Sequence, residues 1–160
     1  MAVASPSVAA GFDTCLVGSW KVTAHKLTGA IQQYTGGTGA TLNVSADGTA
    51  TINFAGSLPA ITVVYAGQGP SQSTSVKGSA TMTMHTASGK LTGTDTGGDV
   101  TVIATIDGVV QHVPPYTFFV AAYMPYGYTC STSTLTITIT SSGVLVTDTV
   151  VTATQIYTRF

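Results

Sequence analysis

The sequence predicts an all-β protein that closes into an up-and-down antiparallel barrel of about 8–10 strands, with a β-sandwich as the alternative. Apolar residues alternate with Thr, Ser and other polar residues along most of the chain, and a period of two is typical of strands with one buried face. Gly, Asp-Gly or Pro recurs roughly every 8 to 15 residues, which indicates short links between neighbouring strands. Because fixed charges are few, five Lys or Arg and six Asp among 160 residues, edge strands would be poorly protected, and closing the sheet removes them.

The predicted strands follow one another with short links that contain residues tolerant of positive φ, such as Asp47-Gly48, Asp107-Gly108 and Ser142-Gly143. Alternation along the first strand places Trp20, Val22 and Ala24 inside and aims His25 outward. Two stretches break the rhythm and are predicted to be long loops, namely 29–39 and the aromatic segment 114–128, of which only 116–123 is expected to form a strand. The predicted strands are 19–27, 40–46, 50–55, 61–66, 74–86, 90–96, 100–106, 109–113, 116–123, 134–140 and 145–158.

Length and composition predict a flexible N-terminal tail at 1–12 followed by a single barrel domain at 13–160. A net charge of -1 without a basic cluster argues against nucleic acid as a partner. No apolar run approaches the length of a membrane-spanning helix, so no membrane insertion is expected. A surface of Thr, Ser and Gly suits a secreted or cell-surface protein, a monomer or weak homodimer. In that compartment Cys15 and Cys130 are expected to pair, the alternative being two buried free thiols.

The segment Leu16-Val17-Gly18-Ser19-Trp20 resembles the Gly-x-Trp start of the first strand in the calycin superfamily, which includes lipocalin-like and fatty-acid-binding-like β-barrels. The resemblance implies that Trp20 lies at the closed end of the barrel, covered by Arg159 from the last strand. Barrel geometry places Arg159 in the same position, because the last strand runs against the first. The same topology brings Cys15 and Cys130 to that end. Fatty-acid-binding barrels hold a carboxylate with Arg-x-Tyr in the last strand, and this chain has Gln155-x-Tyr157 there, so an uncharged ligand is expected.

Aromatic and Met side chains are the candidate lining of a binding cavity, in which phenol hydroxyls would orient a mostly apolar guest. The alternative is that these side chains form an ordinary packed core. Asp148 is a weak catalytic candidate if it points inward, and a residue facing solvent otherwise. The spacing of the histidines indicates no metal site, and no cofactor is expected. The candidate ligand-binding residues are Phe54, Val63, Tyr65, Met82, Met84, Phe118 and Tyr123.

Four functions remain open at this point. The favoured one is a secreted, non-enzymatic barrel that binds a small, mostly apolar, neutral molecule in its interior. The second is an enzyme of the small-barrel cyclase or isomerase type, which would use tyrosines and Asp148. The third is a structural or adhesive module whose threonine ladders face outward and which has no ligand. An outer-membrane barrel, suggested by Phe160 at the C-terminus, is the least favoured.

Overall fold

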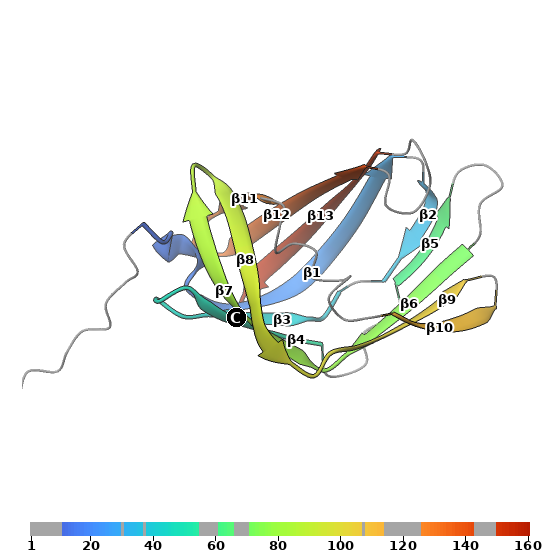
Figure 1. The fold of residues 1–160 in the computed structure, drawn as a ribbon. Coiled ribbons are helices and arrows are strands. Elements are labelled where there is room, and N and C mark those ends of the chain that lie inside the picture. Colours follow the sequence, from blue (N-terminus) through green and yellow to red (C-terminus); the bar gives the residue numbers. More distant parts are fainter. Residues whose placement is uncertain are drawn as a thin grey trace, which may run out of the picture.

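A computed structural model of the protein describes residues 11–29, 31–36, 38–54, 61–65, 71–106, 108–113, 126–142 and 150–160 (Figure 1). A short 3-10 helix, η1 (Thr14–Leu16), precedes the first strand. The strands are β1 (Gly18–Gly29), β2 (Ile31–Thr35), β3 (Thr41–Val44), β4 (Thr49–Asn53), β5 (Ile61–Tyr65), β6 (Ser71–Lys77), β7 (Ser79–Ala87), β8 (Lys90–Gly98), β9 (Thr101–Ile106), β10 (Val109–Val113), β11 (Tyr126–Cys130), β12 (Thr134–Ser142) and β13 (Val150–Arg159).

Eight of these strands form a closed antiparallel barrel in the order β1-β13-β12-β11-β8-β7-β4-β3, which is completed by pairing of β3 with β1. The predicted all-β closed barrel is therefore confirmed, and the chain is not a sandwich. The remaining five strands form a second sheet in the order β10-β9-β6-β5-β2. In Figure 1 this sheet lies to the right of the barrel, away from the end where η1 and the C-terminus are found.

The second sheet continues the barrel strands, because its order β10-β9-β6-β5-β2 repeats the order β11-β8-β7-β4-β3 of their chain neighbours. In the described part of the chain, five barrel strands thus each have a sequence neighbour at the matching place in the second sheet. The predicted strand 74–86 spans one such pair, since it divides into β6 and β7 at Gly78. This glycine has a φ of +97°, and a Cβ there would collide with the backbone carbonyl of Asp99. Two hydrogen bonds hold the chain at this break. The backbone N–H of Ser79 donates to Asp99 Oδ1 at 3.0 Å, and the backbone N–H of Asp99 donates to the Ser79 carbonyl at 2.9 Å.

Two strands arise where loops were predicted. The segment 29–39 contains β2, which pairs with β5, and the segment 114–128 ends within β11, which pairs with β8 and β12. Neither strand shows a clear period of two, because β2 carries consecutive glutamines and β11 has Gly127 at its second position. Long-range pairing therefore decides these strands rather than local pattern. The predicted strand 116–123 lies outside the described residues.

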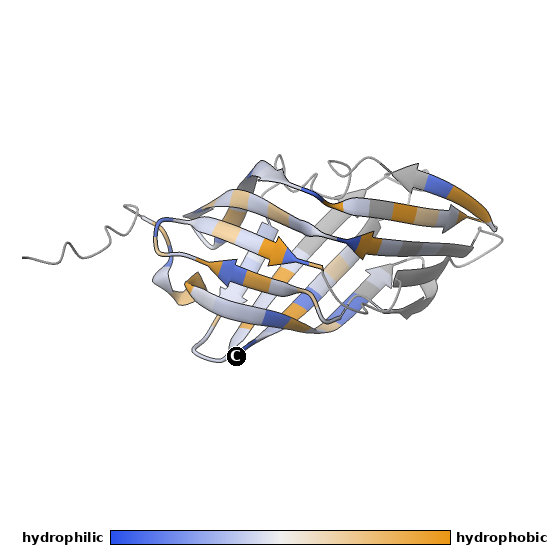
Figure 2. Cartoon of the chain, turned by 90° about the horizontal axis from the view of Figure 1, so that it is seen from below, coloured by the Kyte–Doolittle hydropathy of each residue, from blue (hydrophilic) through white to orange (hydrophobic). Residues whose placement is uncertain are grey.

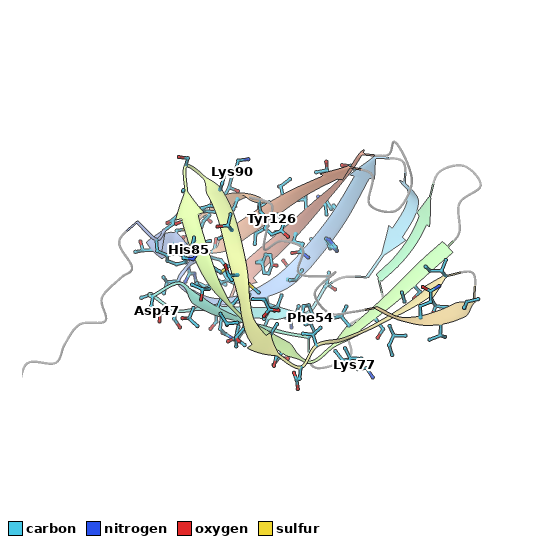
Figure 3. All side chains as sticks on the ribbon, in the orientation of Figure 1. Asp47, Phe54, Lys77, His85, Lys90 and Tyr126 are labelled. Carbon is cyan, nitrogen blue, oxygen red and sulfur yellow. A yellow bond between two sulfur atoms is a disulfide. The ribbon has the colours of Figure 1, made fainter. Side chains whose placement is uncertain are left out.

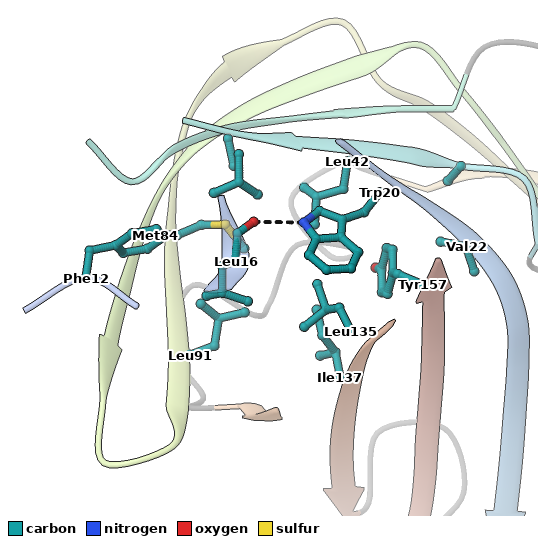
Figure 4. Packing of buried hydrophobic residues seen from close by; sticks show 13 residues of the cluster. Phe12, Leu16, Trp20, Val22, Leu42, Met84, Leu91, Leu135, Ile137 and Tyr157 are labelled. Carbon is teal, nitrogen blue, oxygen red and sulfur yellow. Dashed lines mark hydrogen bonds between the residues drawn. The ribbon is translucent and has the colours of Figure 1, made fainter. Parts of the chain in front are cut away.

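The main core fills the end of the barrel at which η1 lies, hereafter the closed end (Figure 4). Leu16, Trp20 and Leu135 are fully buried there, and the indole Nε1 of Trp20 donates to the Leu16 carbonyl at 2.8 Å. Phe12, at the last position of the predicted tail, is also buried in this cluster. The other buried members are Val22, Ala40, Leu42, Val44, Ala50, Met84, Leu91, Ile137 and Tyr157. On the barrel wall, hydrophobic and hydrophilic positions alternate along the strands (Figure 2).

The start of β1 and the end of β13 meet at the closed end, as the sequence predicts. The guanidinium carbon of Arg159 lies 4.1 Å from the centroid of the Trp20 ring. Its nitrogens donate to the backbone carbonyls of Thr132, Val17 and Cys15 at 2.7, 2.8 and 2.9 Å. Cys15 and Cys130 form a disulfide with a Cα–Cα distance of 6.1 Å, which confirms their predicted pairing. Strands β1, β11, β12 and β13 are therefore tied together at one end.

Candidate ligand site in the barrel

A β-bulge in β1 decides which side chains enter the barrel. Val22 pairs with Tyr157, but the next pair is Ala24 with Ile156, so Thr23 is an extra residue in β1. An extra residue reverses the inside and outside positions that follow it. As a result His25 pairs with Gln155 and lies on the inner face, whereas Ala24 lies on the outer face. The predictions of an outward His25 and an inward Ala24 were wrong for this reason.

Gln155 and Tyr157 lie on the inner face of β13. Tyr157 is only 3% exposed, and its hydroxyl donates to Gln155 Oε1 at 2.8 Å. Burial raises the pKa of Tyr157 well above its ordinary value, and the neighbouring Tyr126 adds to the shift. The phenol of Tyr157 therefore stays protonated across the physiological range and holds the side chain of Gln155 in place.

Tyr126 enters the same region from β11, on the inner face that it shares with Tyr128. It is half-buried and packs against the core of the closed end (Figure 3). Desolvation raises its pKa and is the single cause of the shift. No hydrogen bond of the Tyr126 hydroxyl is found among the described residues. The Tyr126 hydroxyl is thus a protonated donor that makes no hydrogen bond with the described residues.

His25 completes a group that we call the inner polar layer, defined as His25, Tyr126, Gln155 and Tyr157. Its imidazole is half-buried, and desolvation lowers its pKa below the usual value, so it is neutral at pH 7. A neutral imidazole offers one donor and one acceptor. All four members are therefore uncharged at neutral pH. An ion placed among them would lose hydration without gaining an opposite charge from these residues.

Apolar side chains flank this layer. On β12, Leu135 pairs with Tyr157 and Ile137 pairs with Gln155, and these aliphatic side chains are 0% and 6% exposed. Toward the closed end lie Trp20 and Leu16 in its filled core (Figure 4). The barrel is thus solid at one end, and its inner polar layer begins where that solid core ends.

The predicted lining residues lie in different parts of the structure. Met84 is only 6% exposed and belongs to the closed-end core, whereas Met82 is half-buried beside Gly93. Phe54 is half-buried and contacts both this core and a smaller cluster formed by Val76, Ala80 and Val100, near the junction with the second sheet (Figure 3).

Other candidates belong to the second sheet or lie outside the described residues. Val63 and Tyr65 lie on β5 in the second sheet rather than in the barrel wall, and their side chains are outside the described part. Phe118, Tyr123 and Asp148 are outside it altogether.

Sequence reasoning missed His25 as an inner residue and did not single out Tyr126 for the lining. For Tyr126 a signal was present, because it belongs to the aromatic segment 114–128, but the strand that contains it was read as a loop. For His25 there was no signal, since a bulge leaves no mark in the hydrophobic period. His85, in contrast, is exposed on β7 as expected (Figure 3).

Within the described ranges, no three His, Cys, Asp or Glu side chains come close enough to hold a metal ion. The same part of the chain contains no helix long and apolar enough to cross a membrane. Comparisons of the chain with protein-family models, with curated proteins and with solved structures each find no significant match.

Proposed function

We propose that the protein binds a small, mostly apolar, uncharged molecule inside the barrel, above the closed-end core and against the inner polar layer. The observation that carries the proposal is that uncharged polar side chains from three strands lie on the inner face of the barrel next to the apolar core of the closed end. Burying polar groups costs free energy unless they find partners. A folding core has no need of such groups, whereas a binding site uses a few of them to orient a ligand among apolar walls.

The disulfide supports an oxidising, extracytoplasmic environment for this activity, in keeping with a secreted binding protein. We place no cofactor in the site and treat the chain as a monomer or weak homodimer. A second candidate is an isomerase or cyclase, and the neutral His25 near two protonated phenols favours it, because these groups can accept and donate protons. We favour binding without catalysis because it is the simpler function, and an isomerase or cyclase would also have to bind its substrate in this site.

The test compares two variants of neighbouring residues on β13. Ala153 lies two positions from Gln155 on the inner face and pairs with Leu27, whereas Thr154 faces outward and pairs with Lys26. Ala153→Trp adds bulk on the inner face next to the layer, and Thr154→Trp adds the same bulk outside. The probe is N-phenyl-1-naphthylamine, an uncharged dye that fluoresces in apolar surroundings.

We expect the dye to bind the unchanged protein and the Thr154→Trp variant within about 2-fold of each other, and to bind the Ala153→Trp variant at least about 10-fold more weakly, the equivalent of about 1.4 kcal/mol. Circular dichroism establishes that both variants are folded. Absence of dye binding to the unchanged protein, or equal binding by all three, overturns the proposal and favours a structural or adhesive module.

A further inference from the structure

We propose that Tyr126 selects the ligand by donating a hydrogen bond from its hydroxyl to a carbonyl oxygen, so that the ligands are neutral, mostly apolar ketones, aldehydes or esters. This inference rests on the proposed function and names the chemical class of the ligand. It follows from the donors and acceptors that the inner polar layer presents.

Tyr157 is already committed within the protein. Its hydroxyl proton goes to Gln155 Oε1 at 2.8 Å, and it is almost completely buried. That bond uses one of the two lone pairs of the Gln155 amide oxygen. The NH₂ group of the amide adds two donors. The Tyr157–Gln155 pair therefore supplies hydrogen-bond donors that a ligand can use.

Tyr126 adds a further donor. Desolvation raises its pKa, so the hydroxyl keeps its proton, and among the described residues no hydrogen bond of that hydroxyl is found. Tyr126 packs against the buried cluster that contains Tyr157, and Tyr157 is in turn bonded to Gln155. Tyr126 and the Tyr157–Gln155 pair thus lie on the inner face against the same core.

A carbonyl oxygen satisfies such a set because it accepts two hydrogen bonds and brings no donor of its own. A carboxylate would need a cation, and the inner polar layer contains none at neutral pH. A hydrocarbon would leave the Tyr126 hydroxyl desolvated and unpaired, which costs free energy. The expected ligand therefore has an apolar body that fills the barrel and one carbonyl that faces Tyr126.

The experiment uses a matched pair of probes. The first is 6-propionyl-2-(dimethylamino)naphthalene, a neutral ketone whose emission reports hydrogen bonding to its carbonyl. The second is 6-propyl-2-(dimethylamino)naphthalene, in which a methylene replaces that carbonyl. Both are titrated into the oxidised full chain, the Tyr126→Phe variant and the Tyr128→Phe variant. Tyr128 is the control on the same strand, because its hydroxyl donates to Asp13 Oδ2 at 2.9 Å at the closed end.

We expect Tyr126→Phe to bind the ketone about 3- to 10-fold more weakly than the unchanged protein, the size of one net hydrogen bond. The bound ketone should also lose the red shift of its emission. The propyl probe should bind all three proteins within about 2-fold, and Tyr128→Phe should not discriminate between the probes.

The outcomes separate this inference from the proposed function. If both probes bind and Tyr126→Phe weakens them equally or not at all, carbonyl selection by Tyr126 is wrong while binding in the barrel stands. If neither probe binds the unchanged protein, both proposals are overturned. An infrared measurement of the ketone C=O stretch, expected at lower frequency in the unchanged protein than in Tyr126→Phe, supplies a readout that a purely structural role of Tyr126 would not move.

Discussion

Replacing Arg159 with Met tests how the closed end of the barrel is held together. The guanidinium donates to the carbonyls of Thr132, Val17 and Cys15 at 2.7, 2.8 and 2.9 Å. It also lies over the indole of Trp20, 4.1 Å from the ring centroid. One side chain thus connects the end of β13, the turn before β12, η1 and the residue that follows η1. Met keeps most of the apolar stem and removes every one of these interactions.

The size of the effect follows from these contacts. Hydrogen bonds from a charged donor contribute about 1.5–3 kcal/mol each when buried, and because Arg159 is half-buried we count about 1 kcal/mol for each of the three. The cation–π contact adds about 0.5–1 kcal/mol. The contributions share one side chain and do not add fully, so we expect Arg159→Met to lower the free energy of unfolding by about 3 kcal/mol. Arg159→Lys keeps the charge but lacks the forked donors of the guanidinium. Its free energy of unfolding should therefore lie between those of the unchanged protein and Arg159→Met.

The assay is unfolding in guanidinium chloride, followed by far-UV circular dichroism and by the fluorescence of the single Trp. Lys21→Met is the control, since Lys21 is an exposed cation on β1 that pairs with Thr158 beside Arg159. Its removal should change stability by no more than about 0.5 kcal/mol. A loss of less than about 1 kcal/mol in Arg159→Met, on the scale of an ordinary surface substitution, would refute the account of the closed end.

Three further predictions concern stability. Gly48 has a φ of +85°, and a Cβ there would lie 2.7 Å from a carbonyl oxygen of β7. Gly89 has a φ of +72°, but the space around it is open. Gly48→Ala should therefore lower the unfolding midpoint further than Gly89→Ala. Replacing Cys15 and Cys130 together by Ser should cost about 5 kcal/mol in chemical unfolding, because the disulfide spans 115 residues. The raised pKa of Tyr157 means that its contribution is complete below pH 10, the unfolded value, and falls above it by up to about 1.4 kcal/mol per pH unit; Tyr157→Phe should flatten the pH dependence of thermal stability there.

Each of these predictions has an outcome that contradicts it. Equal midpoints for the two glycine variants would mean that the close approach of Gly48 to β7 is absent. A double cysteine variant as stable as the oxidised protein would mean that the disulfide does not restrict the unfolded chain. An unchanged slope above pH 10 in Tyr157→Phe would place the phenol in contact with water rather than in the core.

The contact between Arg159 and Trp20 was predictable because it depends on topology alone. In a closed antiparallel barrel the end of the last strand meets the start of the first, whatever lies between them. The assignment of side chains to the inner or outer face is harder to predict than this contact. It depends on strict alternation of residues along each strand, without an insertion. One extra residue, Thr23, reversed that alternation for His25. A left-handed glycine, Gly78, divided a segment that alternates as a single strand.

The position of the bulge gives β1 two parts with different tasks. Before Thr23, Trp20 and Val22 belong to the core and lie opposite Arg159 and Tyr157. After it, His25 lies opposite Gln155 in the inner polar layer. The polar side chain of His25 can point into the barrel there without disrupting the core, because the core is already packed at the closed end. The disulfide and the Arg159 contacts hold the strands that carry the layer, so that these side chains project from a fixed framework, which is the condition for selective binding.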